Sequence, residues 1–172
     1  MTKFVTQLAP NEVFVYGSNS TGFSGAGAAG YACRGTAENT WRTDPWVDKA
    51  QRAPIGSPDR VGKWAVWGTA RGWSQGREGM GYAIETIKHA GQKRSTPLWE
   101  IEQQFVNLFV FCEEHPQWRF LMTDVGAGLS GYSEAEMADI FVRALDGNLS
   151  NAPDNLVIPE DLYLGLVFTH ER

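Results

Sequence analysis

The sequence predicts an α/β domain of the three-layer α/β/α type, in which helices cover a mixed, largely parallel sheet. A short continuous apolar run at 13–16 and the segment Arg119-Phe-Leu-Met-Thr123, with its apolar centre, have the length and composition of buried strands. Each run leads into a glycine-rich loop and then into a segment with helical spacing. Strands that alternate with helices in this way are typical of a layered α/β fold.

The N-terminal half predicts few regular elements. Residues 25–35 are small and then apolar, which predicts a loop followed by a helix that ends at Gly35. Residues 38–62 contain three prolines and few aliphatic residues, so we expect a loop insertion there. The run 64–67 predicts a strand, residues 68–81 with their five glycines predict a second loop, and 82–84 predict a short strand.

The C-terminal half has clearer signals. Apolar residues three and four positions apart predict a helix over 97–115, and Pro116 would stop it. The pair Ser133 and Glu136 has the spacing of a capping box, so we expect a second helix that begins there and ends near Gly147. Residues 156–158 are expected to be extended, and 163–169 to form a last strand.

Length and composition exclude several classes of protein. The chain has 172 residues, which indicates a single domain over 1–172. A net charge of −5 argues against a nucleic-acid partner. No apolar run approaches ~18 residues and no signal peptide is evident, so we expect a cytoplasmic protein without a membrane partner. The two cysteines lack metal-ligand spacing, and we expect no metal and no cofactor.

Two glycine-rich loops are the main functional signal. The first follows the strand at 13–16 and spans 17–29, and the second follows the strand at 119–123 and spans 124–132. Ligands of open α/β sheets bind outside the carboxyl ends of the strands. Glycines there let backbone N–H groups approach an anion such as a diphosphate. A tight turn is the alternative for each loop alone, but two on one sheet edge favour a ligand site.

Several side chains near these loops are candidates for chemistry. Asp124 follows a strand and fits a general base or a ribose ligand, and equally a surface carboxylate or a cap. Glu85 follows another candidate strand and fits water activation. Trp73 is the best candidate among the clustered tryptophans to stack on a base, with core packing as the alternative.

The combination of motifs resembles the macrodomain superfamily, whose members bind ADP-ribose and related nucleotides. Within it, the closest resemblance is to a short bacterial and phage group. Five phrases carry the resemblance: Tyr16-Gly-Ser-Asn19, Gly25-Ala-Gly-Ala-Ala29, Tyr82-Ala-Ile-Glu-Thr86, Glu114-His-Pro116 and Thr123-Asp-Val-Gly-Ala-Gly-Leu-Ser-Gly-Tyr132. The chain departs from that group at Glu85, where proline is usual, and at Ala127, where cysteine is usual.

The resemblance implies roles for individual residues. Asn19 would bind the distal ribose hydroxyls, and the loop amides would hold the diphosphate. Tyr132 would pack beside them. A loop Asx-turn for Asn19 and core packing for Tyr132 are the structural alternatives. The implied ligand-binding set is Gly17, Ser18, Asn19, Gly25, Ala26, Gly27, Ala28, Trp73, Gly126, Ala127, Gly128, Leu129, Ser130, Gly131 and Tyr132.

These observations predict a small-molecule nucleotide partner of the ADP-ribose or NAD-derived class. Hydrolysis of that ligand, by removal of ADP-ribose or phosphate, would use Asn19 to orient the ribose and Asp124 or Glu85 to activate water. One alternative is a non-catalytic, phage-encoded protein that sequesters or senses a nucleotide. Another is a protein-interaction module whose contact surface is the 38–62 segment with Trp41 and Trp46.

Overall fold

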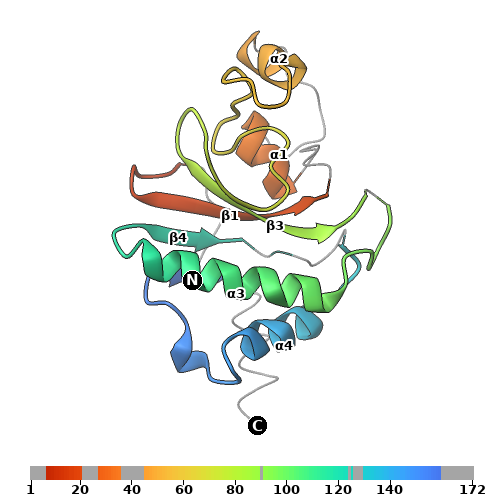
Figure 1. The fold of residues 1–172 in the computed structure, drawn as a ribbon, viewed down its shortest axis with the longest axis vertical. Helices are drawn as coiled ribbons and strands as arrows, with labels where there is room; N and C mark the ends of the chain where they lie inside the picture. Colours follow the sequence, from red (N-terminus) through yellow and green to blue (C-terminus); the bar gives the residue numbers. More distant parts are fainter. Residues whose placement is uncertain are drawn as a thin grey trace.

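The computed structural model describes residues 7–20, 27–35, 45–89, 91–123, 125 and 130–159. These residues form an α/β fold around one five-stranded mixed sheet with the order β2–β3–β1–β4–β5 (Figure 1). Four strands are parallel, and β2 pairs antiparallel with β3 at one edge. The strands are β1 (Glu12–Asn19), β2 (Gly72–Gln75), β3 (Met80–Ile87), β4 (Arg119–Met122) and β5 (Leu156–Val157).

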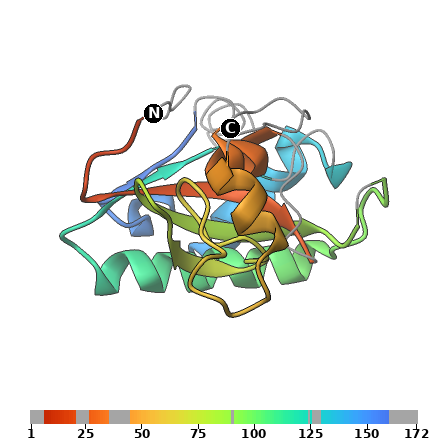
Figure 2. The same ribbon diagram turned by 90° about the horizontal axis from the view of Figure 1, so that it is seen from above.

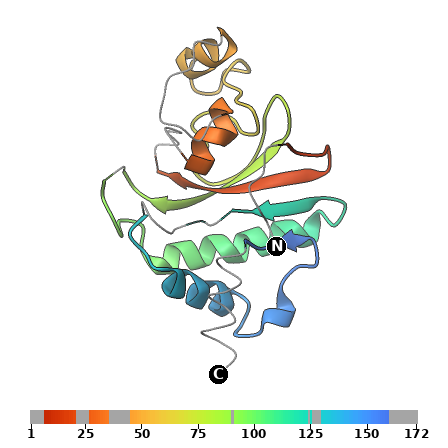
Figure 3. The same cartoon turned by 180° about the vertical axis from the view of Figure 1, so that it is seen from behind.

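Helices lie on both faces of the sheet. Figures 1 and 3 show α3 and α4 on one side and α1 and α2 on the other. Seen from above in Figure 2, α1 and α2 lie in front of the sheet. The helices are α1 (Gly27–Arg34), α2 (Pro45–Arg52), α3 (Leu98–Glu114) and α4 (Glu134–Ala144), followed by the 3₁₀ helix η2 (Leu149–Asn151). No helix among the described residues has both the length and the apolarity to cross a membrane.

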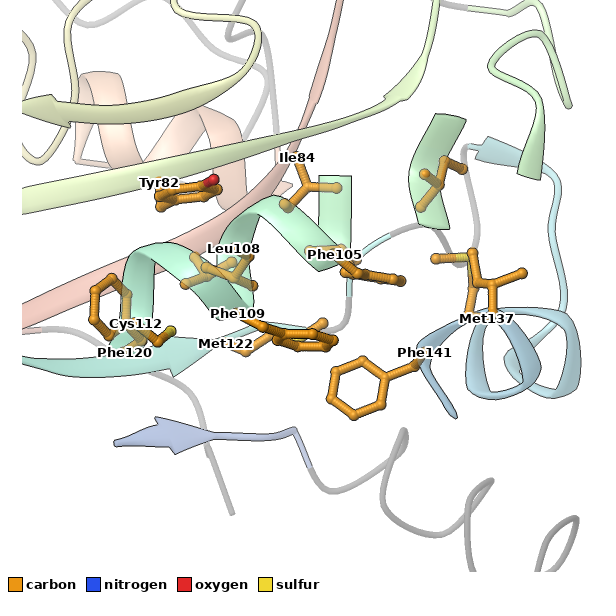
Figure 4. Close-up of a cluster of buried hydrophobic side chains, with 14 of the residues drawn as sticks. Tyr82, Ile84, Phe105, Leu108, Phe109, Cys112, Phe120, Met122, Met137 and Phe141 are labelled. Carbon is orange, nitrogen blue, oxygen red and sulfur yellow. The ribbon is translucent and has the colours of Figure 1, made fainter. Parts of the chain in front are cut away.

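Alternate residues of β1 serve two separate cores. Val13 and Val15 pack with α3 and α4, whereas Phe14 and Tyr16 pack with α1. This is why the strand reads as a continuous apolar run rather than an alternating one. In the larger core, the ring of Phe141 from α4 meets those of Phe105 and Phe109 from α3 edge to face, with centroids 5.5 and 5.3 Å apart (Figure 4).

The helix predictions at 97–115 and after Ser133 are confirmed. Leu98–Glu114 is helical, and the Ser133 hydroxyl accepts the N–H of Glu136 while the Glu136 carboxylate accepts the N–H of Ser133. The end of α3 is held by Asn155, whose side-chain amide donates to three main-chain carbonyls of residues 112, 115 and 118 at 2.9–3.0 Å. Both helices are therefore fixed at an end by polar side chains.

The predicted strand at 64–67 is wrong. This segment is a bend whose Trp64 and Trp67 are buried against α1. Main-chain N–H groups at the start of this bend bond the last carbonyls of α1. The N–H of Trp64 donates to the carbonyl of Ala32 at 2.6 Å, and the N–H of the preceding Lys63 donates to that of Cys33 at 3.1 Å. The apolar run was long enough for a strand, but it packs as a cap on a helix instead.

Two predicted loops contain regular structure. Residues 38–62 include α2, whose Ala50 is fully buried in the same core as residues of α1. Arg60 then donates to the carbonyls of Ala53 at 2.8 Å and of Trp67 at 3.0 Å, which ties this segment to the bend. Residues 68–81 include β2 and the start of β3, so the short strand expected at 82–84 is longer. The strand expected at 163–169 lies outside the described residues.

Candidate functional site

The two glycine-rich loops leave the sheet from neighbouring strands. β1 and β4 are parallel and paired, with Val15 opposite Met122, so their carboxyl ends lie at the same edge. Thr123 closes the end of β4, since both its N–H and its hydroxyl donate to the carbonyl of Val15, at 2.9 and 2.7 Å. Seven of the predicted site residues lie outside the described residues: Gly25, Ala26, Asp124, Gly126, Ala127, Gly128 and Leu129.

The end of β1 is irregular, as a strand that turns into a binding loop often is. The pairing of β1 with β3 shifts between Ser18 and Asn19. The Ser18 hydroxyl is buried and donates to the carbonyl of Ala70, so it supports the fold. Gly17 and Asn19 are half-buried on either side of it. Asn19 thus occupies the last position of the strand, next to the start of the first loop.

The first loop leads into α1. Gly27 and Ala28 are its first two residues, and Ala28 packs partly against the core below. The residue before the helix is alanine, which has no side-chain oxygen to accept an N–H of the first turn. In α4, by contrast, the capping box already satisfies two of those donors. The sequence therefore places no side-chain cap directly before α1, whereas α4 has one.

The second loop ends in a packed and hydrogen-bonded segment. Tyr132 is buried, and its hydroxyl donates to the carbonyls of Thr96 at 2.5 Å and Arg94 at 3.3 Å. Burial raises the pKa of this phenol. Ser130 is also buried, and its carbonyl accepts the N–H of Arg94 at 2.6 Å. Gly131 between them has φ +85°. The described contacts of Tyr132 are those of a packing residue.

Glu85 lies at the end of β3 inside a network of two acids and two bases. Its side chain is 5% exposed and pairs with Arg71 at 2.5 Å and with Lys88 at 3.1 Å. Glu100, from the first turn of α3, pairs with the same two bases at 2.8 and 2.9 Å. Hydrogen bonds from Lys88 and Arg71 lower the pKa of Glu100. These ion pairs tie Glu85 of β3 to Arg71 and Lys88, so its described contacts are those of a residue that fixes the strand.

The backbone of Glu85 is held by a residue that the sequence analysis did not single out. The pairing of β2 with β3 ends at Ala83. Glu85 is the next residue whose N–H and carbonyl point to the side of β3 where β2 lies. No residue of β2 is opposite Glu85 to bond these two groups. The buried side chain of Gln104 from α3 accepts that N–H at 2.6 Å and donates to that carbonyl at 2.8 Å. In the sequence, Gln104 could have been noticed because it is a single amide side chain among the apolar residues on one face of the predicted helix.

Trp73 is not brought to this edge. It lies on β2 opposite Tyr82 and stacks on Trp118, with ring centroids 5.9 Å apart. Trp118 immediately precedes β4, so the pair lies toward the amino end of the parallel strands. An open hollow of about 450 Å³ also lies toward that end and is lined by Cys112, Glu113, Pro116, Ala152, Pro153, Asp154 and Asn155. Neither feature belongs to the candidate site.

Metal and thiol chemistry find no support in the described part of the chain. That part contains no group of three His, Cys, Asp or Glu side chains able to hold a metal ion. Cys33 and Cys112 are buried and are not joined by a disulfide, and burial raises the pKa of Cys112 to about 12.

Comparison of the chain with protein-family models, with curated proteins and with solved structures finds no match. Function is therefore inferred from the strand ends, from the helix that follows the first loop and from the segment that joins β3 to α3.

Proposed function

We propose that this chain binds a nucleotide of the ADP-ribose class across the carboxyl ends of β1, β3 and β4, as members of the macrodomain superfamily do. The observation that carries the proposal is the pairing of β1 with β4. It starts two glycine-rich loops side by side, each of them leading to a helix. That is the edge at which α/β sheets bind their ligands.

The charge of the chain fits this mode of binding. A net charge of −5 would repel a diphosphate if recognition depended on the overall field. Main-chain N–H groups of a glycine-rich loop and of a helix N-terminus avoid this problem because they act at short range. We assign the diphosphate to the first loop and the start of α1, whose N-terminus lacks the side-chain capping box found in α4. Asn19, at the end of β1, is assigned to the distal ribose.

Hydrolysis of the bound nucleotide is the further step of this proposal. Asn19 would orient the ribose, and Asp124, which follows β4, would accept a proton from the attacking water. Of the two predicted bases we favour Asp124. Glu85 would have to give up its contacts with Arg71 and Lys88 in order to act. A non-catalytic nucleotide binder differs from this proposal only in returning its ligand unchanged.

Thermal unfolding with a nucleotide panel tests binding. The panel contains ADP-ribose, its phosphorylated and cyclic forms, NAD, ADP and AMP. A ligand at ~100 times its Kd adds about 2.7 kcal/mol of stability, which raises Tm by roughly 5–10 °C for a domain of this size. We expect a shift with ADP-ribose and none with AMP. No shift with any member of the panel would refute the proposal.

Two variants locate the site. Asn19→Ala and Gly128→Glu should each remove the ADP-ribose shift, the first by deleting the ribose contact and the second by filling the loop with an acidic side chain. Asn107→Ala is the matched control, because Asn107 is an exposed asparagine on the outer face of α3. If ADP-ribose raises the Tm of both site variants as much as it raises that of the wild type, the site is assigned wrongly.

Turnover is measured on the recovered ligand. The substrate is ADP-ribose that carries a phosphate on its distal ribose, and water breaks the bond between that phosphate and the ribose. After incubation and denaturation, we expect ADP-ribose and free phosphate from the wild type and from Glu85→Gln, and the intact phosphorylated nucleotide from Asp124→Asn. Recovery of intact nucleotide from all three proteins would instead favour a sequestering or sensing protein.

A further inference from the structure

The end of β1 is fastened to the residue that follows β3. Asn19, the last residue of β1, lies opposite Ile87, the last residue of β3. Lys88 comes next in the chain, and its carbonyl accepts both the N–H and the hydroxyl of Ser20, at 3.2 and 2.5 Å. Lys88 is therefore held beside Asn19, the residue that we assign to the distal ribose.

A second basic residue is held at the same strand end. The buried hydroxyl of Ser18 donates to the carbonyl of Ala70, and Arg71 is the next residue. The register of the sheet places Ser18 opposite Glu85, whose carboxylate accepts the Nε–H of Arg71 at 2.5 Å. The two neighbours of Asn19 in the chain are thus fastened to the two segments that carry Arg71 and Lys88.

Arg71 and Lys88 belong to a closed ring of four charges. Each of these bases contacts both Glu85 and Glu100, with nitrogen–oxygen distances of 2.5–3.1 Å. The side chains of the two acids are 5% and 21% exposed, whereas those of Arg71 and Lys88 are 45% and 34% exposed. The carboxylates thus lie deeper than the bases that they hold, and the outer part of the ring is basic.

The ring leaves N–H donors for an anion. Arg71 donates through Nε to Glu85 and through Nη2 to Glu100, and no described residue accepts a hydrogen bond from its Nη1. The Lys88 ammonium has three N–H donors and contacts two carboxylate oxygens. Guanidinium and ammonium groups both bind phosphate oxygens well. Because the two acids fix these side chains beforehand, an anion that binds here would have to order few groups.

The balance of charge indicates which anions the ring can bind. Two acids and two bases carry no net charge, so the ring adds no long-range attraction to a chain whose net charge is −5. A free anion would therefore bind weakly. An anion attached to a ligand that Asn19 already holds is brought to the ring at a high effective concentration. A group on the distal ribose meets that condition.

We propose that Arg71 and Lys88 form a phosphate-binding subsite beside Asn19, which binds a phosphate on the distal ribose and makes the protein prefer phosphorylated ADP-ribose to ADP-ribose. The inference rests on the proposed function, since the nucleotide brings the phosphate to the ring. Nη1 of Arg71 and the Lys88 ammonium donate to the phosphate oxygens, while Glu85 and Glu100 keep both bases in place.

Calorimetric Kd values for two ligands test the subsite. One ligand is ADP-ribose. The other is a phosphonate analogue of ADP-ribose phosphorylated on its distal ribose, in which carbon replaces the bridging oxygen so that water cannot remove the group. We expect the wild type to bind the phosphonate about tenfold more tightly, which corresponds to ~1.4 kcal/mol. Arg71→Gln and Lys88→Gln should each lose most of that preference, because each removes a donor and leaves the ring with a net negative charge.

The ratio of the two Kd values separates a binding role from a structural one. Urea unfolding measures how much stability each variant loses. A purely structural ring would weaken both ligands equally in Arg71→Gln and leave the ratio as it is in the wild type. If Arg71→Gln does not fold, Arg71→Lys gives the same comparison. Lysine keeps the charge beside Glu85 but has no Nη1, so the preference for the phosphonate should still fall.

The matched control is Arg119→Gln. Arg119 is an exposed arginine whose Nη1 lies 3.8 Å from a carboxylate oxygen of Glu12. It is the first residue of β4 and so lies at the amino end of the parallel strands, away from Asn19. This substitution removes the same charge from the chain and should leave the ratio unchanged. An equal loss of preference in Arg119→Gln would mean that net charge sets the ratio, and the inference would be overturned.

Inorganic phosphate distinguishes failure of this inference from failure of the proposed function. Thermal unfolding is compared in a high concentration of phosphate and in sodium chloride of equal ionic strength. If the wild type binds no nucleotide, but phosphate raises its Tm and not that of Arg71→Gln, the proposed function fails and the subsite stands. If the wild type binds ADP-ribose without preferring the phosphonate, or if Arg71→Gln keeps the preference, the subsite is wrong and the proposed function stands.

Discussion

Gln104 closes the open edge of β3, and its replacement by leucine has an effect that can be worked out from the structure. The side-chain amide is buried and makes two hydrogen bonds, at 2.6 and 2.8 Å, to the backbone of Glu85. Leucine fills a similar volume but leaves a buried N–H and a buried carbonyl without partners. Each orphaned group costs about 1–3 kcal/mol, and burial of the leucine offsets about 1–2 kcal/mol of the sum. We expect a net loss of roughly 3 kcal/mol.

Urea unfolding measures this loss, and thermal unfolding should show Tm lower by roughly 6–12 °C. The matched control is Gln103→Leu, because Gln103 is the exposed neighbour whose amide contacts only the side chain of Asn107. That variant should stay within about 0.5 kcal/mol of the wild type. If Gln104→Leu cost less than about 1 kcal/mol, β3 would not depend on Gln104, and the argument for a held strand end would be wrong.

Three further changes probe other contacts. The hydrogen bonds from Arg94 lower the pKa of Glu136 to about 2, so the stability that this pair provides should be present above pH 4.5 and be lost as the pH falls toward 2. Urea unfolding across that range should show this loss in the wild type and a flatter profile in Glu136→Gln. Asn155→Ala removes the amide that three carbonyls share at the end of α3, and we expect a loss of about 2 kcal/mol in urea unfolding. Gly131→Ala adds a Cβ 2.7 Å from a lysine Cβ at φ +85°, whereas Gly147→Ala meets no atom within 4 Å at φ +77°. By thermal unfolding, the first should therefore be clearly the less stable of the two.

The parts of the fold that the sequence predicted depend on local chemistry. The helix over Leu98–Glu114 follows from apolar spacing and a proline at each end, and the start of α4 follows from Ser133 and Glu136. The strand at 13–16 is apolar because it is buried on both faces, and the apolar residues Phe120, Leu121 and Met122 of β4 are buried as well. The sequence also predicted that the two glycine loops begin at one edge of the sheet. The strands that precede them, β1 and β4, are paired in parallel and so end at the same edge.

The wrong predictions concern residues whose role is set by distant contacts. Glycines within 68–81 were interpreted as loop residues, yet Gly81 lies inside β3. A Cβ there would be 2.5 Å from the carbonyl oxygen of Trp64. Likewise, a Cβ on Gly62 would be 2.7 Å from the Cα of Cys33. These glycines permit two backbones to approach closely, and a single sequence does not distinguish that use from a flexible loop.

The polar residues that organise the candidate site were missed for the same reason. Gln104 acts on a backbone 19 positions away, and Arg94 acts on Glu136, 42 positions away. Glu85 was noted as a departure from the family pattern, but its two basic partners could not be inferred from its neighbours. The local sequence gives a sign of such a contact when a polar side chain lies on the apolar face of a helix. Of the two residues, Gln104 has this sign and Arg94 does not.

The 38–62 segment decides how the interaction-module alternative can be tested. Deletion of the segment should unfold the α1 side of the protein, because Ala50 is fully buried there and Gly62 packs on the end of α1. We therefore expect the deletion to lose cooperative thermal unfolding together with nucleotide binding. Ile55 is 90% exposed in this segment, and Ile55→Ser should keep both the stability and the ADP-ribose shift of the wild type. A deletion variant that unfolds cooperatively near the wild-type Tm would show that the segment is an appendage of the fold and would refute this expectation.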